Sequence, residues 1–165
     1  MPTLVISIGS NIDATRNLRK AHAALLAEFH NINCSTVFES EAVGFKGDNF
    51  LNLVALIETE LTLADIAIRL KRIEDVLGRD RQQPKFSGRT MDIDVLTFGD
   101  ATGKDCGMEL PREEITRNAF VLRPLAELLP AQLHPPSGKH YAALWQEFDQ
   151  SRQKLWTVAF DWTSA

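Results

Sequence analysis

The residues with the clearest chemical potential are two aspartates, Asp92 and Asp94, separated by a single isoleucine. They lie in an apolar, strand-like stretch, Arg89-Thr90-Met91-Asp92-Ile93-Asp94-Val95-Leu96. Side chains alternate along a strand, so both carboxylates are predicted on one face, about 6.5–7 Å apart at the backbone, with the intervening apolar residues facing the core. Two such carboxylates repel each other and lose hydration, which favours a neighbouring cation. Mg²⁺ suits the pair, because it takes carboxylate oxygens and usually also binds substrate phosphates.

A run of basic residues lies just before the acidic pair. Arg79, Arg81, Lys85 and Arg89 fall within eleven residues, with Asp80 the only acid among them. This arrangement fits a phosphate on Mg²⁺: the acids hold the metal, and the metal and arginines neutralise the phosphate oxygens. Both motifs also occur on solvated surfaces that bind nothing. The sequence contains neither a Walker A loop nor G-x-G-x-x-G, which excludes a P-loop or Rossmann nucleotide site.

The apolar pattern predicts the elements that position these residues. Strands are expected where short apolar runs stop at turn residues, and helices where apolar residues recur every three or four positions. Thr62, with an aspartate three residues later, is typical of a helix N-cap. The predicted strands are 3–8, 31–38, 50–59, 91–98 and 155–162, the predicted helices are 15–29, 62–78, 119–129 (interrupted near Pro124) and 141–151, and loops are expected at 39–49, 79–88 and 99–107.

This order predicts the fold class. The succession β-α-β-β-α-β indicates an α+β, ferredoxin-like architecture, in which helices sandwich an antiparallel sheet and a further helix and strand follow at the C-terminus. The chain has 165 residues, which fits a single domain over 1–165.

Composition narrows the class of protein. The apolar fraction of 44%, the charged fraction of 24% and the net charge of −4 exclude a disordered chain and a strongly basic nucleic-acid binder. No apolar run approaches the about 18–20 residues that span a bilayer, and the N-terminus lacks the basic region of a signal peptide. Cys34 and Cys106 form no C-x-x-C and are expected as thiols. We therefore expect a cytoplasmic monomer that binds small molecules, and neither nucleic acid nor membrane.

Several motifs in order carry a family resemblance. They are Gly9-Ser10-Asn11, Phe50-Leu51-Asn52, Arg72-Ile73-Glu74, Gly78-Arg79, Gly88-Arg89-Thr90-Met91-Asp92-Ile93-Asp94 and Ala119-Phe120-Val121-Leu122-Arg123-Pro124-Leu125. Over most of its length the chain resembles the 6-hydroxymethyl-7,8-dihydropterin pyrophosphokinases of folate biosynthesis. The R-T-x-D-x-D element is specific in combination with the others, whereas G-S-N alone is weak.

The resemblance implies an activity and a set of site residues. Family members transfer pyrophosphate from ATP to the hydroxymethyl oxygen of the pterin and release AMP. By resemblance, Asp92 and Asp94 ligate two Mg²⁺ ions and act in catalysis with Arg79, Arg81 and Arg89. The residues implied for the nucleotide are Lys71, Glu74, Arg89, Arg112 and Arg117, and those implied for the pterin are Val43, Phe50, Asn52 and Phe120. For the two phenylalanines, plain core packing is the competing interpretation.

Some positions depart from the family pattern. Ser40-Glu41-Ala42 replaces a usual T-P-P, Phe86 a tryptophan, Gly88 a proline, and Arg112 a histidine; Asn118 and Gly107 stand where arginines are common. The acidic residues expected to bind the metal are thus retained, whereas cationic residues expected farther along the ATP site are missing or stand at other positions. Two further hypotheses follow: a weakly active or non-catalytic module that binds pterin or nucleotide, and an RNA-binding domain of the RRM type, which the acidic charge and missing RNP1 pattern disfavour.

Overall fold

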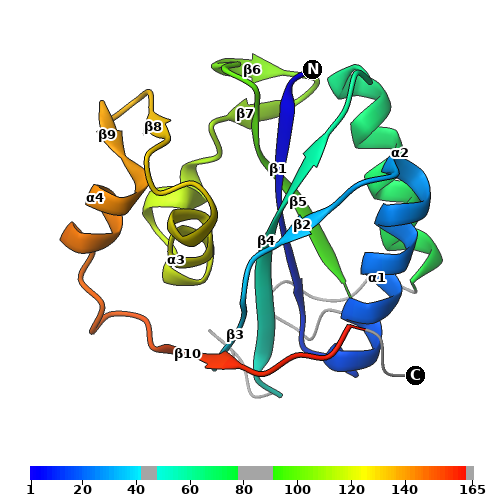
Figure 1. Cartoon of the computed structure of the whole chain (residues 1–165), viewed down its shortest axis with the longest axis horizontal. Helices are drawn as coiled ribbons and strands as arrows, with labels where there is room; N and C mark the ends of the chain where they lie inside the picture. Colours follow the sequence, from blue (N-terminus) through cyan, green and yellow to red (C-terminus); the bar gives the residue numbers. More distant parts are fainter. Residues whose placement is uncertain (42–47, 78–90, 163–165) are drawn as a thin grey trace.

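The computed structural model describes residues 1–41, 48–77 and 91–162. Within them, an antiparallel sheet of six strands has helices on both faces (Figure 1). The strand order is β10-β3-β4-β1-β5, and the short β2 also pairs with β4. The strands of this sheet are β1 (Thr3–Ser10), β2 (Asn33–Cys34), β3 (Val37–Ser40), β4 (Phe50–Glu58), β5 (Asp92–Phe98) and β10 (Leu155–Val158). The helices are α1 (Ala14–Phe29), α2 (Leu63–Val76), α3 (Ala119–Leu128) and α4 (Tyr141–Glu147), with a 3-10 turn at Glu113–Thr116.

One face of the sheet is covered by α1 and α2. Both helices place buried apolar residues every three or four positions against alternate residues of β1, β4 and β5. The N-cap of α2 is as predicted, because the Thr62 hydroxyl accepts a hydrogen bond from the Asp65 backbone N–H at 3.2 Å. This face contains the larger of the two apolar clusters.

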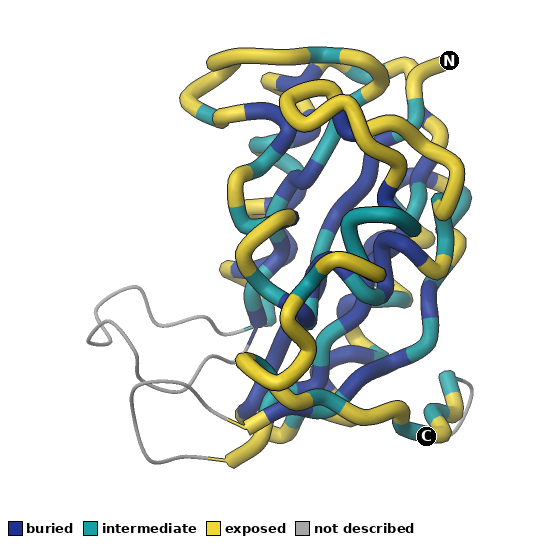
Figure 2. The backbone as a smooth tube through the Cα atoms, turned by 90° about the vertical axis from the view of Figure 1, so that its left-hand side faces the viewer, coloured by how far each residue is buried: buried dark blue, intermediate teal, exposed yellow. Residues whose placement is uncertain are grey.

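The opposite face is covered by α3 and α4. Val5, Val54 and Leu96 of the sheet pack against Leu122 and Leu125 of α3 in a second apolar cluster. Figure 2 shows the resulting distribution, with buried residues along the strands and exposed residues along the connections around them. The predicted α+β, ferredoxin-like class with helices on both faces is therefore confirmed, and the additional C-terminal strand extends the sheet as β10.

The predicted strand 31–38 is wrong as a single element. The chain forms β2 and β3 with a break at Ser35, whose hydroxyl accepts a hydrogen bond from the Val54 N–H at 3.0 Å and donates one to the Thr36 carbonyl at 2.8 Å. The Ser35 side chain thus replaces the backbone carbonyl as the acceptor for Val54, while the Ser35 N–H still donates to the Val54 carbonyl at 2.8 Å. The loop predicted over 39–49 begins only after Ser40 in the structure, because Glu39 and Ser40 belong to β3 and pair with both β4 and β10.

The predicted interruption of the helix at Pro124 is also wrong. Residues 119–128 form one helix with Pro124 inside it. The proline removes one intrahelical hydrogen bond, but the helix buries Val121, Leu122 and Leu125 on both sides of it, and this packing on the sheet keeps the helix continuous.

Both C-terminal elements are shorter than predicted. Helix α4 ends at Glu147, and the Asp149 side chain then accepts a hydrogen bond from the Ser151 N–H at 3.1 Å in a local turn. Strand β10 ends at Val158, after which Arg19 of α1 donates a hydrogen bond to the Asp161 carbonyl at 2.7 Å. The end of the chain therefore leaves the sheet to pack on α1.

Two hairpins were not predicted from the sequence. One joins β6 (Gly103–Asp105) and β7 (Met108–Leu110) through Cys106 and Gly107, both with positive φ, as tight hairpin turns require. The other joins β8 (Leu133–His134) and β9 (Lys139–His140). Strands of two or three residues give too little alternation to be read from a sequence. Both cysteines are free thiols, as expected.

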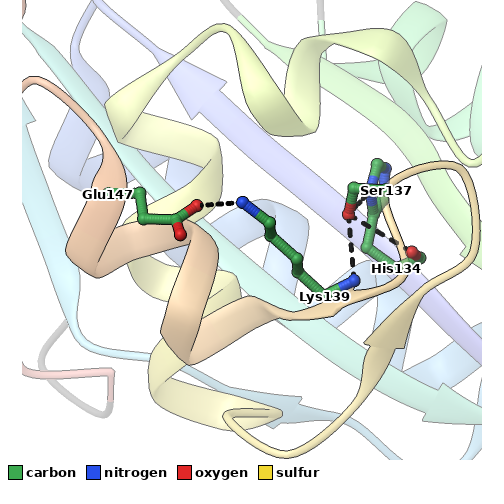
Figure 3. Close-up of polar contacts among 4 residues, drawn as sticks. All are labelled: His134, Ser137, Lys139 and Glu147. Carbon is green, nitrogen blue, oxygen red and sulfur yellow. Dashed lines mark hydrogen bonds and ion pairs between the residues drawn. The ribbon is translucent and has the colours of Figure 1, made fainter.

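His134 in the second hairpin is a structural residue. Its Nδ1 lies 2.8 Å from the Ser137 Oγ, which also accepts a hydrogen bond from the Lys139 N–H at 3.2 Å, while the Lys139 ammonium pairs with Glu147 at 2.7 Å (Figure 3). The imidazole is only 6% exposed and packs against Tyr141. These contacts tie the hairpin to both ends of α4, at Tyr141 and at Glu147.

The buried state of His134 predicts a pH dependence of stability. Burial lowers the pKa of this imidazole below its ordinary value of 6.5. The unfolded chain then binds more protons than the folded one, so the free energy of unfolding should decrease as the pH falls below about 6.5. Urea unfolding at several pH values should show this decrease and a flatter profile for His134→Asn. His22, whose pKa burial also lowers, is present in both proteins and cancels in the comparison.

Candidate active site

The acidic pair lies on β5, an edge strand of the sheet. Asp92 and Asp94 are partly exposed, and they alternate with Ile93 and Val95, which are at most 5% exposed and face the α1–α2 core. Both carboxylates therefore share one face, as the alternation predicts. In the neighbouring strand β1, Gly9 lies opposite Asp92 and Ser7 opposite Asp94.

Arg112 is brought to the acidic pair by the chain that follows β7. Its backbone N–H donates a hydrogen bond to the Leu96 carbonyl of β5 at 2.8 Å, which anchors it beside the strand. The guanidinium lies 3.6 Å from the Asp94 carboxylate and 3.1 Å from that of Glu114. Burial alone lowers the pKa of Arg112, but the carboxylates of Asp94, Glu114 and Asp92 outweigh it, so the pKa is raised. The Arg112 guanidinium therefore places a permanent positive charge next to the acidic pair, and it remains partly exposed to solvent.

Glu74 approaches β5 from α2, on the side of the α1–α2 core. The side chain is 6% exposed, and its carboxylate accepts a hydrogen bond from the Ile93 N–H at 2.8 Å. Because β5 is an edge strand among the strands that the structure describes, this N–H has no described neighbouring strand to bond. The carboxylate satisfies it and fixes the segment between the two aspartates.

We expect Glu74 to contribute strongly to stability. Glu74→Ala leaves the buried Ile93 N–H without its acceptor and should lower the free energy of unfolding by about 2 kcal/mol. Glu74→Gln keeps an acceptor of the same length and should lose clearly less. Urea denaturation of the two variants checks this, and equal losses would contradict the role of the hydrogen bond.

The Gly9-Ser10-Asn11 motif shapes the face beside the acids. A Cβ on Gly9 would lie 2.4 Å from the Asn52 Oδ1, so the asparagine side chain occupies the space above this glycine. Asn11 is 3% exposed and donates a hydrogen bond to the Asp48 carbonyl at 3.1 Å, which fixes the chain as it enters β4. The motif therefore makes room for Asn52 and fixes the start of its strand.

A cross-strand row links these groups. Phe38 of β3, Asn52 of β4, Gly9 of β1 and Asp92 of β5 lie opposite one another in register. Asn52 has no side-chain hydrogen bond to any residue in the described ranges, so its amide presents a donor and an acceptor on the α3 side of the sheet. Asp92 lies two strands away in the same row.

Two phenylalanines lie on the same side of the sheet as Asn52. Phe50 is two residues before it on the same face of β4 and is paired in register with Ser40 of β3. Phe120, the second residue of α3, is partly buried and lines a cavity of about 370 Å³ together with Ser40 and Glu41. The structure thus gathers the predicted pterin residues that it describes, an amide and two aromatic rings, on the face that carries the acids.

The other predicted site residues are either exposed on the surface or outside the described residues. Arg117 forms an ion pair with Glu113, with both side chains largely exposed, and Lys71 is exposed on α2. Val43, Arg79, Arg81 and Arg89 lie outside the described residues. In the described ranges no group of three or more histidine, cysteine or acidic side chains forms a metal site, and the acidic pair supplies two carboxylates. No helix in those ranges has the length and apolarity needed to cross a bilayer.

Sequence comparisons identify a family. The family model "7,8-dihydro-6-hydroxymethylpterin-pyrophosphokinase (HPPK)" matches residues 5–130. A 2-amino-4-hydroxy-6-hydroxymethyldihydropteridine pyrophosphokinase of Aquifex aeolicus is 33% identical over 138 residues, which cover 82% of this chain and 85% of the relative. A Synechocystis protein of the same name is 31% identical over 158 residues, covering 94% and 80%.

Solved structures agree on the fold. The Plasmodium falciparum HPPK-DHPS wild type, crystallised with pterin and p-hydroxybenzoate, superposes with a TM-score of 0.67 at 14% identity. The match covers 88% of this chain, which spans only 43% of that longer protein. Together with the sequence match over most of the chain, the site geometry leads to one conclusion: this chain belongs to the 7,8-dihydro-6-hydroxymethylpterin-pyrophosphokinase family.

Proposed function

We propose that this chain transfers the pyrophosphoryl group of ATP to 6-hydroxymethyl-7,8-dihydropterin in folate biosynthesis. The hydroxymethyl oxygen attacks the β-phosphorus of ATP, the bond from that phosphorus to the α,β-bridging oxygen breaks, AMP leaves, and the hydroxyl proton passes to solvent. The observation that carries the proposal is the shared face of the acidic pair and Asn52, in a chain whose sequence matches this family over residues 5–130.

The phosphate end is assigned to Asp92, Asp94 and Arg112. Hard carboxylate oxygens on one partly exposed face fit Mg²⁺, and we expect two ions with ATP as co-substrate. When bound, Mg²⁺ neutralises phosphate charge. Arg112 lies 3.6 Å from Asp94, so its guanidinium is positioned to contact an anionic phosphate brought to the acids. Catalysis here rests on positioning and electrostatics.

The acceptor end is assigned to Asn52, Phe50 and Phe120. A pterin is a flat heterocycle with an amide-like edge, and an asparagine amide can both donate to and accept from such an edge. The two phenylalanines supply apolar surface for the ring. Val43 is assigned to the same end by resemblance to the family.

The remaining assignments complete the proposal. Lys71, Glu74 and Arg117 are assigned to the nucleotide, and Arg79, Arg81 and Arg89 to the phosphates and catalysis. For Glu74 the hydrogen bond to the Ile93 N–H indicates an indirect contribution, through the strand that carries the acids. We expect a cytoplasmic monomer that acts on small molecules and binds no nucleic acid.

A single assay tests the proposed function. The protein is mixed with MgATP and 6-hydroxymethyl-7,8-dihydropterin, and nucleotides and pterins are separated by chromatography. The proposal predicts AMP and pterin diphosphate in equal amounts. Tight binding of both substrates without turnover would instead indicate a non-catalytic binding module, and ADP as the product would contradict pyrophosphoryl transfer.

A further inference from the structure

The segment that precedes β10 caps the helix that carries Phe120. The Gln153 Oε1 accepts a hydrogen bond from the Ala119 N–H at 2.7 Å, and its Nε2 donates to the Asn118 Oδ1 at 3.1 Å and the Arg117 carbonyl at 3.3 Å. Ala119 is the first residue of α3, where backbone N–H groups lack intrahelical acceptors. The N-cap residue Asn118 makes no side-chain capping bond, so a side chain 34 residues away in sequence supplies the acceptor for Ala119.

The same segment forms a wall of the cavity beside Phe120. Gln153 and Leu155 line the cavity of about 370 Å³ with Ser40 and Phe120. Leu155 is paired in register with Ser40, and Ser40 with Phe50, so the wall continues into the sheet next to the proposed acceptor site. Figure 1 shows how this arises: the chain after α4 returns to the sheet edge and adds β10 beside β3.

The family model ends at residue 130 and assigns no role to this segment. The alignment with the Synechocystis relative covers 94% of the chain and includes the segment, again without assigning it a role. A role for the segment follows from two observations: Gln153 makes three hydrogen bonds at the start of α3, and it lines the same cavity as Phe120.

We propose that Gln153 is a positioning residue for the acceptor substrate. Gln153 fixes the first turn of α3 and thereby holds Phe120 against the ring of a bound pterin. This inference rests on the proposed function. Gln153 itself touches neither ATP nor the acidic pair, so its loss should weaken the interaction with the acceptor and spare the chemical step.

Three variants separate positioning from general stability. Gln153→Met keeps the side-chain length and removes all three hydrogen bonds. Gln153→Glu keeps the acceptor for the Ala119 N–H, and a negative charge is favourable at a helix N-terminus. It loses the two hydrogen bonds that Nε2 donates to the Arg117 carbonyl and the Asn118 Oδ1, so it isolates the contribution of the bond to Ala119. Gln150→Ala is the matched control, since Gln150 is exposed in the same segment and has no side-chain hydrogen bond to the described residues.

Steady-state kinetics with both substrates varied gives the test. Gln153→Met should raise the KM for the pterin about fivefold to tenfold, which is the size of a lost helix cap. Its kcat and its KM for ATP should remain within about twofold of wild type. Gln153→Glu should recover most of the lost pterin affinity, and Gln150→Ala should match wild type. Hydrogen exchange at the Ala119 amide should be fastest in Gln153→Met and intermediate in Gln153→Glu.

The outcomes distinguish this inference from the proposed function. An active wild type with an unchanged pterin KM in Gln153→Met would overturn the inference alone. So would equal losses in kcat and in both KM values, or Gln153→Glu no better than Gln153→Met. If Gln153→Met does not fold, Gln153→Glu is compared with wild type alone. Faster Ala119 exchange with a raised pterin KM and an unchanged kcat supports the inference, and an unchanged pterin KM overturns it. A wild type that neither binds pterin nor releases AMP overturns the proposed function and this inference together.

Discussion

Asp94→Ala should lower kcat about a thousandfold while leaving pterin affinity within about twofold of wild type. Asp94 lies in the partly exposed acidic pair, and Arg112 is 3.6 Å from it, so the substitution removes both a proposed cation ligand and an ion-pair partner of the guanidinium. The acceptor groups Phe50, Asn52 and Phe120 belong to β4 and α3 and keep their places. AMP release and a binding titration with the pterin measure the two effects separately.

The control for this substitution is Asp100→Ala. Asp100 is an exposed carboxylate two residues beyond the end of β5, so its removal changes the net charge equally but leaves the acidic pair intact. It should retain wild-type turnover. A loss of pterin affinity as large as the loss of rate in Asp94→Ala would contradict the separation of a phosphate end from an acceptor end.

Gly9→Ala should weaken pterin binding about tenfold to a hundredfold with little change in fold. Gly9 has ordinary strand backbone in β1, so alanine is allowed there. The added Cβ would lie 2.4 Å from the Asn52 Oδ1 and must displace that amide. In the proposed function Asn52 offers the donor and acceptor for the pterin edge, so its displacement should remove hydrogen bonds to the ring. Calorimetric titration with the pterin measures the change.

Ile8→Val is the matched control on the same strand. Ile8 points to the α1–α2 core and is 3% exposed, so the variant should lose about 1 kcal/mol of stability through a small cavity. Its pterin affinity should equal that of wild type. If Ile8→Val weakened pterin binding as much as Gly9→Ala, the effect would belong to β1 as a whole and the role of Asn52 would be wrong.

The local parts of the site could be predicted from the sequence. Asp92 and Asp94 were assigned to one strand face because alternation along a strand depends only on neighbouring residues. The same rule placed Phe50 and Asn52 together on β4. The N-cap at Thr62 is likewise a property of four consecutive residues. In each case the structure has the expected arrangement.

The contacts between distant segments could not be predicted in this way. Arg112 reaches Asp94 only because its backbone bonds to Leu96 after a hairpin that the sequence pattern did not reveal. Gln153 caps α3 across a separation of 34 residues, and no signal in its own neighbourhood marks it. The sequence does place a glycine before Ser10, but only the register with Asn52 explains why a side chain is excluded there.

Two of the positions that depart from the family pattern, Arg112 and Asn118, make defined contacts in the structure. Arg112 stands where the family commonly has a histidine, and the structure holds it against the acidic pair with its charge fixed. A guanidinium there can neutralise phosphate but cannot titrate near neutral pH. Asn118, where an arginine is common, instead contributes its Oδ1 to the hydrogen bonds of Gln153. One position therefore carries a permanent cation in place of a titratable group, and the other makes a structural contact.

The most direct test of the central claim is metal binding at the acidic pair. Mn²⁺, a spectroscopic substitute for Mg²⁺, is titrated by electron paramagnetic resonance in the presence of a non-hydrolysable ATP analogue, with wild type and with the double variant Asp92→Asn, Asp94→Asn. We predict a protein-bound signal for wild type and only the metal–nucleotide signal for the double variant. Equal protein-bound signals from the two proteins would contradict the assignment of this pair as the metal site.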